Sequence, residues 1–326
     1  MPPKVSVIMS VYNGGSHLEE SVQSILEQEF GDFELVVVED GSTDGSGELL
    51  ARFAERDTRL VVLRQAHRGL TPSLNRAVEA ARGPYVARQD ADDVSLPQRL
   101  GRQVRYLDEH PSIGATGTGA EIIDERGQVV GRIPTLQGSE NIKQGLLHVR
   151  ATLVHGSVMM RRDVFQAAGG YREAFRFCQD FDLWLRLTQE TALENLPEIL
   201  FRWRINPAGI YATQRMRQLQ YGGIGLAFAL ERRRLGVDSY PLLEEAGVDL
   251  DTFAERYHLR RTLYSIWGEL LLRGLDDPAA ARPYLQRAVR HGDVRPKTLC
   301  YFWLALSGRR WLGTPPIQAH ALTGAS

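Results

Sequence analysis

The sequence predicts an α/β fold, in which a mostly parallel central sheet is flanked by helices and followed by a helical C-terminal region. Strand-like and helix-like segments alternate with short loops through the first third of the chain, as parallel strands joined by helices do. The run Leu35–Val38 is apolar throughout, which is typical of a strand buried on both faces. Beyond about residue 211 the chain is rich in Arg, Leu and Ala and has a helical period.

The individual elements follow from their apolar patterns and from their start and stop signals. Strands are expected at residues 5–9, 35–38, 60–63, 85–88 and 157–160. Helices are expected at residues 18–29, after 46, and at 73–82, 98–109, 163–168 and 181–187. Two short β-like runs within 121–130, separated by polar turn residues, predict a hairpin. We therefore expect one domain over residues 1–210 and a helical region over residues 211–326.

Composition restricts the classes of protein to consider. The 326 residues are 43% hydrophobic, and 39 Lys and Arg against 40 Asp and Glu give a net charge of -1, which argues against a nucleic-acid partner. Cys178 and Cys300 fit neither a metal-ligand spacing nor a disulfide framework, so a reducing compartment is expected. The N-terminus lacks signal-peptide features, and the apolar run 299–306 is too short to span a bilayer. We expect a soluble, cytoplasmic protein.

The acidic run Asp90-Ala91-Asp92-Asp93 is the most informative motif. Three carboxylates within four residues repel one another, so a fold that brings them together usually supplies a cation. The run follows a predicted strand, and ligands of open α/β sheets bind outside the carboxyl ends of the strands. The sequence therefore favours a cation that faces a phosphorylated ligand, with a solvated acidic turn as the alternative.

A second carboxylate, Asp40, lies where the second predicted strand ends, in a glycine-containing loop. It can accept a hydrogen bond from a base N–H, while Ser46 further along the loop is a candidate helix N-cap. The dinucleotide fingerprint G-x-G-x-x-G does not follow the first strand, and the chain has no P-loop motif. An NAD-dependent oxidoreductase and a P-loop NTPase are therefore disfavoured.

Taken in order, these segments resemble the family 2 glycosyltransferases, which have the Rossmann-like GT-A fold. The resemblance covers residues 4–205, and residues 87–100 are similar to bacterial members that build surface polysaccharides and O-antigens. The segments that carry it are Val5–Asn13, Val38–Asp44, Gly69 with Asn75, Asp90–Asp93, His155–Arg161, Gly169–Tyr171 and Gln179–Arg186.

The resemblance implies a site for a nucleotide-diphosphate sugar. Asp40 would bind the base, Asp90 would lie near the ribose, and Asp92 would coordinate the Mg²⁺ or Mn²⁺ that bridges the two donor phosphates, with Asp90 as a second candidate ligand. Asp93 is a candidate metal partner or N-cap. The remaining residues expected at the donor are Val11, Tyr12, Asn13, Arg68, Asn75, Ala91 and Arg204, the last of which could equally form a surface salt bridge.

The resemblance also implies a catalytic base, Asp180, which would take the proton of the acceptor hydroxyl in a single inverting displacement. A helix N-cap is the alternative role for Asp180, and Asp182 is expected to be structural. His155 and Trp184 are candidates for acceptor or phosphate contacts, and a structural role for His155 is the alternative.

Two departures from the family pattern bear on these expectations. His67 stands where the family often has Asn, and Asn206 stands where it has a His. The second departure puts a third protein ligand to the metal in doubt.

In the C-terminal region, Arg295, Lys297, Arg309 and Arg310 flank the aromatic run 301–303. This pattern suits an interfacial helix near anionic lipids, and a buried helix is the alternative.

The expected function is therefore an inverting, metal-dependent transfer of a sugar, with UDP-sugars favoured by resemblance, to a glycan or lipid-linked acceptor in surface polysaccharide synthesis. One alternative is a nucleotide-sugar-binding scaffold without catalysis, which would have no need of both Asp92 and Asp180. The other is a sugar nucleotidyltransferase, for which we would expect a basic phosphate loop near the first strand. The loop Asn13–His17 contains neither Lys nor Arg.

Overall fold

The computed structural model describes residues 1–148, 152–206, 213–252, 268, 272, 278–290 and 296–307. Backbone contacts divide the chain into two compact units. The first comprises Met1–Leu146 and Arg150–Thr213, and the second comprises Leu147–Val149 and Gln214–Ser326. The boundary predicted between residues 210 and 211 lies outside the described residues.

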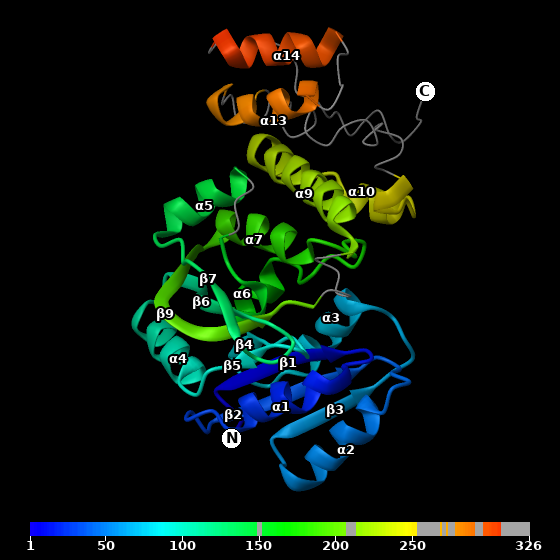
Figure 1. Ribbon diagram of the computed structural model, residues 1–326, viewed down its shortest axis with the longest axis vertical. Helices are drawn as coiled ribbons and strands as arrows, with labels where there is room; N and C mark the ends of the chain where they lie inside the picture. The colour runs from blue at the N-terminus through cyan, green and yellow to red at the C-terminus, as the bar shows by residue number, and fades with distance from the viewer. Residues whose placement is uncertain are drawn as a thin grey trace. The chain divides into compact units, whose positions relative to one another are not determined.

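The first unit is built on a sheet that has nine strands in the described part of the chain, in the order β3-β2-β1-β4-β8-β6-β9-β5, with β7 also paired to β6 (Figure 1). Its parallel half consists of β1 (Val5–Val11), β2 (Phe33–Glu39), β3 (Leu60–Arg64) and β4 (Tyr85–Arg88). The other strands are β5 (Val94–Ser95), β6 (Ile113–Ile123), β7 (Val129–Ile133), β8 (Met159–Arg161) and β9 (Ala192–Arg204). The predicted α/β class, with its mostly parallel sheet, is confirmed.

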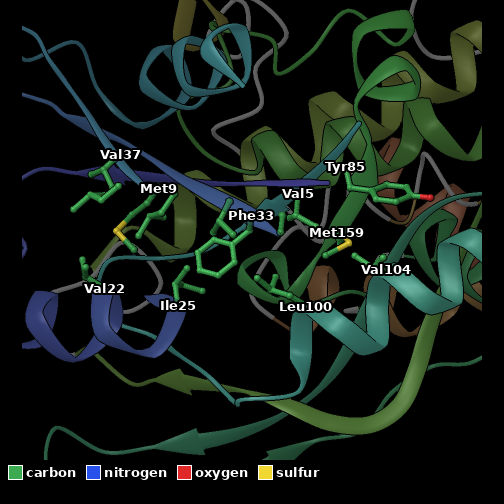
Figure 2. Packing of buried hydrophobic residues seen from close by; sticks show 14 of the residues in the cluster. Val5, Met9, Val22, Ile25, Phe33, Val37, Tyr85, Leu100, Val104 and Met159 are labelled. Atoms are coloured by element: carbon green, nitrogen blue, oxygen red, sulfur yellow. The ribbon is translucent and has the colours of Figure 1, made fainter. Parts of the chain in front are cut away.

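Helices connect the strands and cover the sheet. They are α1 (Leu18–Leu26), α2 (Ser46–Arg56), α3 (Leu70–Ala80), α4 (Arg99–Glu109), α5 (Ser139–Leu147), α6 (Arg162–Ala167) and α7 (Gln179–Glu190), with short 3₁₀ turns at Gly15–His17 and at His155–Ser157. Val22 and Ile25 of α1 and Leu100 and Val104 of α4 pack on sheet residues such as Phe33 (Figure 2). Burial of these apolar faces fixes the strand ends from which the motif loops emerge.

The hairpin expected within 121–130 is present, because β6 and β7 pair antiparallel with a bulge between Ile122 and Ile123. The sequence did not predict β9. This strand runs parallel to β6 and brings Arg204 beside Ile123. It matters for the site because it ends at Arg204, two residues before Asn206.

The second unit is helical in its described part, as predicted. It contains α9 (Arg215–Leu235), α10 (Tyr240–Glu245), α13 (Pro278–Arg290) and α14 (Pro296–Ser307). Helix α9 ends at Gly236, whose left-handed φ of 79° lets its N–H reach the carbonyl of Arg232. None of the helices in the described segments is both long and apolar enough to span a bilayer.

Candidate active site

The motif loops meet at the carboxyl edge of the parallel strands. Asn13, in the turn that follows β1, has a left-handed φ of 51° and bridges to the loop after β2. Its N–H donates to Ser42 Oγ at 3.0 Å, and its Oδ1 accepts from the Thr43 N–H at 2.8 Å. The Asp40 N–H donates to the carbonyl of Val11 at 2.8 Å. The loops expected on either side of the donor base are therefore held together.

The Asp40 carboxylate is buried and organises the segment 65–69. It accepts hydrogen bonds from Gln65 Nε2 at 2.7 Å and from the backbone N–H groups of Arg68 and Gly69, both at 2.8 Å. His67 Nδ1 lies 3.0 Å from Asp40 Oδ2. A carboxylate has about four acceptor positions, so these partners fill it. Contact of Asp40 with a base stays a prediction, and it requires one of these partners to give way.

An aromatic surface lies beside this carboxylate. The rings of Tyr12 and His67 stack with their centroids 3.9 Å apart, and Tyr12 is 48% exposed. Arg68 contributes its backbone N–H to Asp40. Tyr12 is thus available to a planar ligand at the position where the sequence predicts the base.

The three carboxylates of the acidic run have different surroundings. Asp90 is paired with Arg88 of β4, and a Cβ built on Gly156 would lie 3.1 Å from Asp90 Oδ2. Burial, together with the negative charge of Asp90, raises the pKa of Asp92, although a hydrogen bond from the Asn206 side chain opposes the shift. The carboxylate expected to hold a metal is therefore in contact with the residue that replaces the family's His.

Asp93 is the buried carboxylate of the acidic run, and it binds the backbone of β9. Its Oδ1 accepts the N–H of Arg204 at 2.8 Å, across 111 positions of sequence. Burial and the negative charges of Asp90 and Asp92 raise its pKa well above the usual range. Asp93 therefore fixes the loop against the sheet.

Arg204 is likewise occupied within the protein. Its Nε donates to the carbonyl of Asp92 at 2.8 Å, its Nη1 to that of Asp124 at 3.0 Å, and its Nη2 to Glu20 Oε2 at 2.5 Å. The side chain is 1% exposed. We assign Arg204 to supporting the acidic loop, and contact with the donor stays a prediction.

Asp180 lies in the first turn of α7, whose N-cap is Cys178, so Asp180 is not the cap residue. It is half-buried, and its negative charge acts on both His155 and Tyr171. His155 Nε2 lies 2.8 Å from Tyr171 Oη, and the ring also packs edge-on against Trp184 at 6.1 Å. Burial and the nearby Arg88 lower the pKa of His155, and Asp180 and Asp90 oppose that shift. The turn that carries His155 thus abuts Asp90 through Gly156 and packs against α7, the helix that carries Asp180.

Asn75 faces the protein backbone in this structure. Its Nδ2 donates to the carbonyl of Tyr171 at 2.8 Å, and its Oδ1 accepts the Tyr171 N–H at 3.0 Å. Asp182 is buried and pairs with Arg186 at 2.9 Å and with Arg172 at 3.3 Å, consistent with the structural role expected for it. These contacts hold the segment that leads to Asp180.

The sequence alone predicted no role for Arg88 or Tyr171. Arg88 could have been noticed as an arginine at the end of a predicted buried strand, two residues before Asp90. Nothing in the local sequence predicts the contact between Tyr171 and His155, because it depends on how the segments fold together.

The donor set suits a hard divalent cation. No group of three or more His, Cys, Asp or Glu side chains forms a ready-made metal site within the described segments. Asp92 and Asp90 offer carboxylate oxygens, which is the donor type that Mg²⁺ and Mn²⁺ prefer. Mg²⁺ is usually held by one or two carboxylates together with substrate phosphates. The residues present fit a cation that is bound together with a diphosphate.

The fold and these side chains define an α/β enzyme whose carboxylates gather at the carboxyl ends of parallel strands. The profile of Glycosyl transferase family 2 matches residues 6–169, half of the chain. The chain belongs to this family and is a glycosyltransferase. The resemblance seen in the sequence is thus confirmed.

Two relatives show the same likeness over about three fifths of this chain. EpsE of Bacillus subtilis (strain 168), named as a glycosyltransferase, is 37% identical over 208 residues, which cover 62% of this chain and 73% of EpsE. The O-antigen biosynthesis glycosyltransferase WbnJ of Escherichia coli is 32% identical over 206 residues, which cover 62% of this chain and 80% of WbnJ.

Two solved structures share the GT-A fold. Residues 1–349 of TarS from S. aureus, solved in complex with UDP-GlcNAc, superpose with a TM-score of 0.62 at 15% identity and cover 94% of this chain and 92% of that one. The mannosyltransferase PcManGT from Pyrobaculum calidifontis, in complex with GDP-Man and Mn²⁺, gives a TM-score of 0.57 at 20% identity and covers 94% of this chain and 81% of that one.

Proposed function

We propose that this glycosyltransferase is inverting and metal-dependent. It moves a sugar from a nucleotide-diphosphate sugar, a UDP-sugar, to a hydroxyl of a glycan or lipid-linked acceptor in surface polysaccharide synthesis. The observation that carries the proposal is the position of the turn His155–Ser157. A Cβ built on Gly156 would lie 3.1 Å from Asp90 Oδ2, and His155 packs against Trp184 of α7, the helix that carries Asp180. A candidate metal loop and a candidate base thus border one site.

In this mechanism Asp180 takes the proton of the acceptor hydroxyl as that oxygen attacks the anomeric carbon from the face opposite the leaving group. Asp180 is half-buried in the first turn of α7, so part of its carboxylate remains open to an acceptor hydroxyl. His155, held by Tyr171, lines the space between Asp180 and the acidic run. Trp184 packs against His155 and adds an apolar wall.

Donor binding is assigned to the carboxyl edge of the parallel strands. The turn Val11–Asn13 and the Asp40 loop border the base, and Tyr12 supplies a stacking surface. Asp92, with Asp90 beside it, would hold Mn²⁺ or Mg²⁺ against the donor phosphates. Such a cation stabilises the charge that develops on the departing nucleoside diphosphate. PcManGT was solved in complex with GDP-Man and Mn²⁺, and TarS in complex with UDP-GlcNAc, which supports a donor of this class.

The acceptor assignment rests on relatives. WbnJ is named for O-antigen biosynthesis, and another relative, AmsE of Erwinia amylovora, for amylovoran biosynthesis. Both names indicate polysaccharide products, so we infer a glycan or lipid-linked acceptor here.

The test combines a donor panel with one substitution. UDP-, dTDP- and GDP-sugars are compared by thermal shift and donor hydrolysis, with and without Mn²⁺. We expect one nucleotide to stabilise the protein, and only when Mn²⁺ is present. Asp180→Asn removes the base but keeps the shape of the side chain, so transfer should fall at least about 100-fold while donor affinity stays within about twofold. Equal losses of transfer and donor affinity would contradict the role of Asp180 as base.

We also infer that α14 contacts the inner face of the membrane. Its residues Leu299 and Leu306 are 42% and 52% exposed, whereas Tyr301 and Ala305 are buried among helices of the same unit. Lys297 lies near the start of the helix. The flanking Arg295, Arg309 and Arg310, on which the sequence prediction also relied, lie outside the described residues.

Vesicle flotation tests this contact. Leu299→Ser with Leu306→Ser should reduce binding to vesicles that contain phosphatidylglycerol, because apolar side chains and basic flanks together bind an anionic surface. Leu235→Ser, which alters a leucine that is 63% exposed at the end of α9, is the matched control. Equal flotation of wild type and the double variant would exclude α14 as the contact.

A further inference from the structure

Arg88 is a buried charge at the centre of the candidate site. Its side chain is 0% exposed, its Nη1 donates to the carbonyl of Gln89, and its Nη2 pairs with Asp90. Its Nε has no hydrogen-bond partner within the described part of the chain. A buried guanidinium is strongly destabilising unless a close anion compensates its charge, and Asp90 is that anion.

A second buried arginine lies beside Arg88 but has a different set of partners. Arg99 of α4 donates to Gln89 Oε1 at 3.1 Å, to Ser95 Oγ at 2.7 Å and to the carbonyl of Arg88 at 2.6 Å. These three partners are neutral oxygens. Burial and then the charge of Arg88 lower the pKa of Arg99 to about 9, although Asp93 and Asp90 oppose the shift. Of these two buried arginines, Arg88 is therefore the one whose guanidinium pairs with a carboxylate of the acidic run.

The three carboxylates of the acidic run also differ in their binding partners. Asp90 is held by Arg88, and Asp93 accepts the N–H of Arg204. Asp92 interacts with the neutral side chain of Asn206. The charge of Arg88 also acts on Asp92, but the ion pair of Arg88 is formed with Asp90.

We infer that Arg88 is the resident counter-cation of the acidic run: it holds Asp90 while no metal is bound and leaves Asp92 to receive the cation that arrives with the donor. This inference rests on the proposed metal dependence. Because Arg88 and a metal ion would compete for Asp90, the resting protein binds free divalent cations weakly. Because the guanidinium of Arg88 is part of the chain, its positive charge offsets the repulsion among the three carboxylates even when no metal ion is bound. Arg88 is thus a positioning residue for the metal loop.

The test measures metal binding and stability without any substrate. Arg88→Met removes the charge but keeps most of the side-chain bulk, and it releases Asp90. In EDTA the variant should unfold at a lower temperature than wild type, and Mn²⁺ should restore more of its stability than it adds to wild type. Its affinity for Mn²⁺, titrated by electron paramagnetic resonance, should rise on the order of tenfold, the scale on which residues around a metal site alter affinity.

Three variants separate this role from simple packing. Arg186→Gln breaks another buried Arg–Asp pair, that with Asp182 at 2.9 Å, and should lose stability that Mn²⁺ does not restore. Arg88→Lys keeps the charge and should keep the weak affinity of wild type. Combining Arg88→Met with Asp90→Asn should abolish the gain in affinity, because the released ligand is gone.

Asp90→Asn alone keeps the inference testable even where Arg88→Met fails to fold. Asp90→Asn should lower stability in EDTA, because Arg88 is left without its ion pair. The affinity for free Mn²⁺ should stay within about twofold of wild type. A loss of about tenfold, the size that follows changes around metal sites, would show that Asp90 already binds the metal and would overturn the inference. Unchanged or reduced Mn²⁺ affinity in Arg88→Met would overturn the role of Arg88 alone. Failure of wild type to bind Mn²⁺, with or without UDP, would overturn the metal dependence together with this inference.

Discussion

Substitution of Asn75 tests whether this residue touches the donor or supports the site from within the protein. The sequence predicts the first role, while its two hydrogen bonds to Tyr171, at 2.8 and 3.0 Å, indicate the second. Asn75→Ala leaves the carbonyl and the N–H of a buried residue without partners. Each unsatisfied group costs about 1–3 kcal/mol, and because Asn75 is only half-buried, water can reach part of the gap, so we expect a total loss of about 2–4 kcal/mol.

The assay is thermal unfolding of the variant beside its control, with donor affinity measured on the same samples. A loss of this size should lower the unfolding temperature by several degrees, at about 2–4 °C per kcal/mol for a domain of about 150–250 residues. Asn141→Ala is the matched control, because Asn141 makes a single exposed bond to the carbonyl of Gln137 at 2.9 Å. Its effect should stay within about 0.5 kcal/mol.

Transfer by Asn75→Ala should also fall, because Tyr171 holds His155 and the following segment leads to Asp180. The affinity for the donor should change little. An Asn75→Ala protein that unfolds at the wild-type temperature but binds the donor ten times more weakly would refute the supporting role and favour the contact predicted from the sequence.

Two further predictions concern the segment that joins the metal loop to the base. Gly156→Ala places a Cβ 2.5 Å from Phe201 Cζ and 3.1 Å from Asp90 Oδ2, so we expect a loss of about 1–3 kcal/mol in thermal unfolding. Gly101→Ala, in the interior of α4 with its nearest atom at an ordinary 3.7 Å, should instead gain about 0.5–1 kcal/mol; equal effects of the two changes would contradict the close packing at Gly156. His155 has a pKa lowered from 6.5 by burial and by Arg88, so its neutral form stabilises the fold above that pH and the stability is lost as pH falls below it. The difference in unfolding temperature between wild type and His155→Gln should therefore shrink between pH 7 and about pH 5, and a difference that stays constant over this range would show that the imidazole is not buried in its neutral form.

The parallel half of the fold could be predicted because its signals are local. Apolar runs such as Leu35–Val38 predict strands, and the periodic segments between them predict helices, without reference to the rest of the chain. Strand β9 could not be predicted in the same way. Its burial does not alternate, because its pairing with β6 shifts register around Thr118 and Gly119, and polar residues such as Glu194 and Asn195 interrupt its apolar pattern. This strand exists because β6 pairs with it along most of its length.

The candidate site shows the same division. Asp40 and the acidic run could be singled out from their residue types and their places after predicted strands, whereas Asp180 was implied by the resemblance to the family. The sequence could not separate residues that touch the donor from residues that hold the site in place. That difference depends on hydrogen bonds between distant segments, such as those of Asn75 with Tyr171 and of Arg204 with Asp93. Asn206 is instructive in this respect. The sequence marked it as the loss of a family His, and the structure places its side chain on Asp92, the carboxylate that the missing ligand would have assisted.

These supports converge on the short turn His155–Ser157. Ser157 Oγ accepts the Thr118 N–H at 3.2 Å, and the Ser157 carbonyl accepts from Gln103 at 2.8 Å, so the turn is fixed to β6 and to α4. On one side Gly156 abuts Asp90, and on the other His155 meets Tyr171, beside Asp180. The turn therefore contacts both the acidic loop and the segment that precedes Asp180. A change in the core beneath the turn would alter the relation of the two carboxylates without touching either.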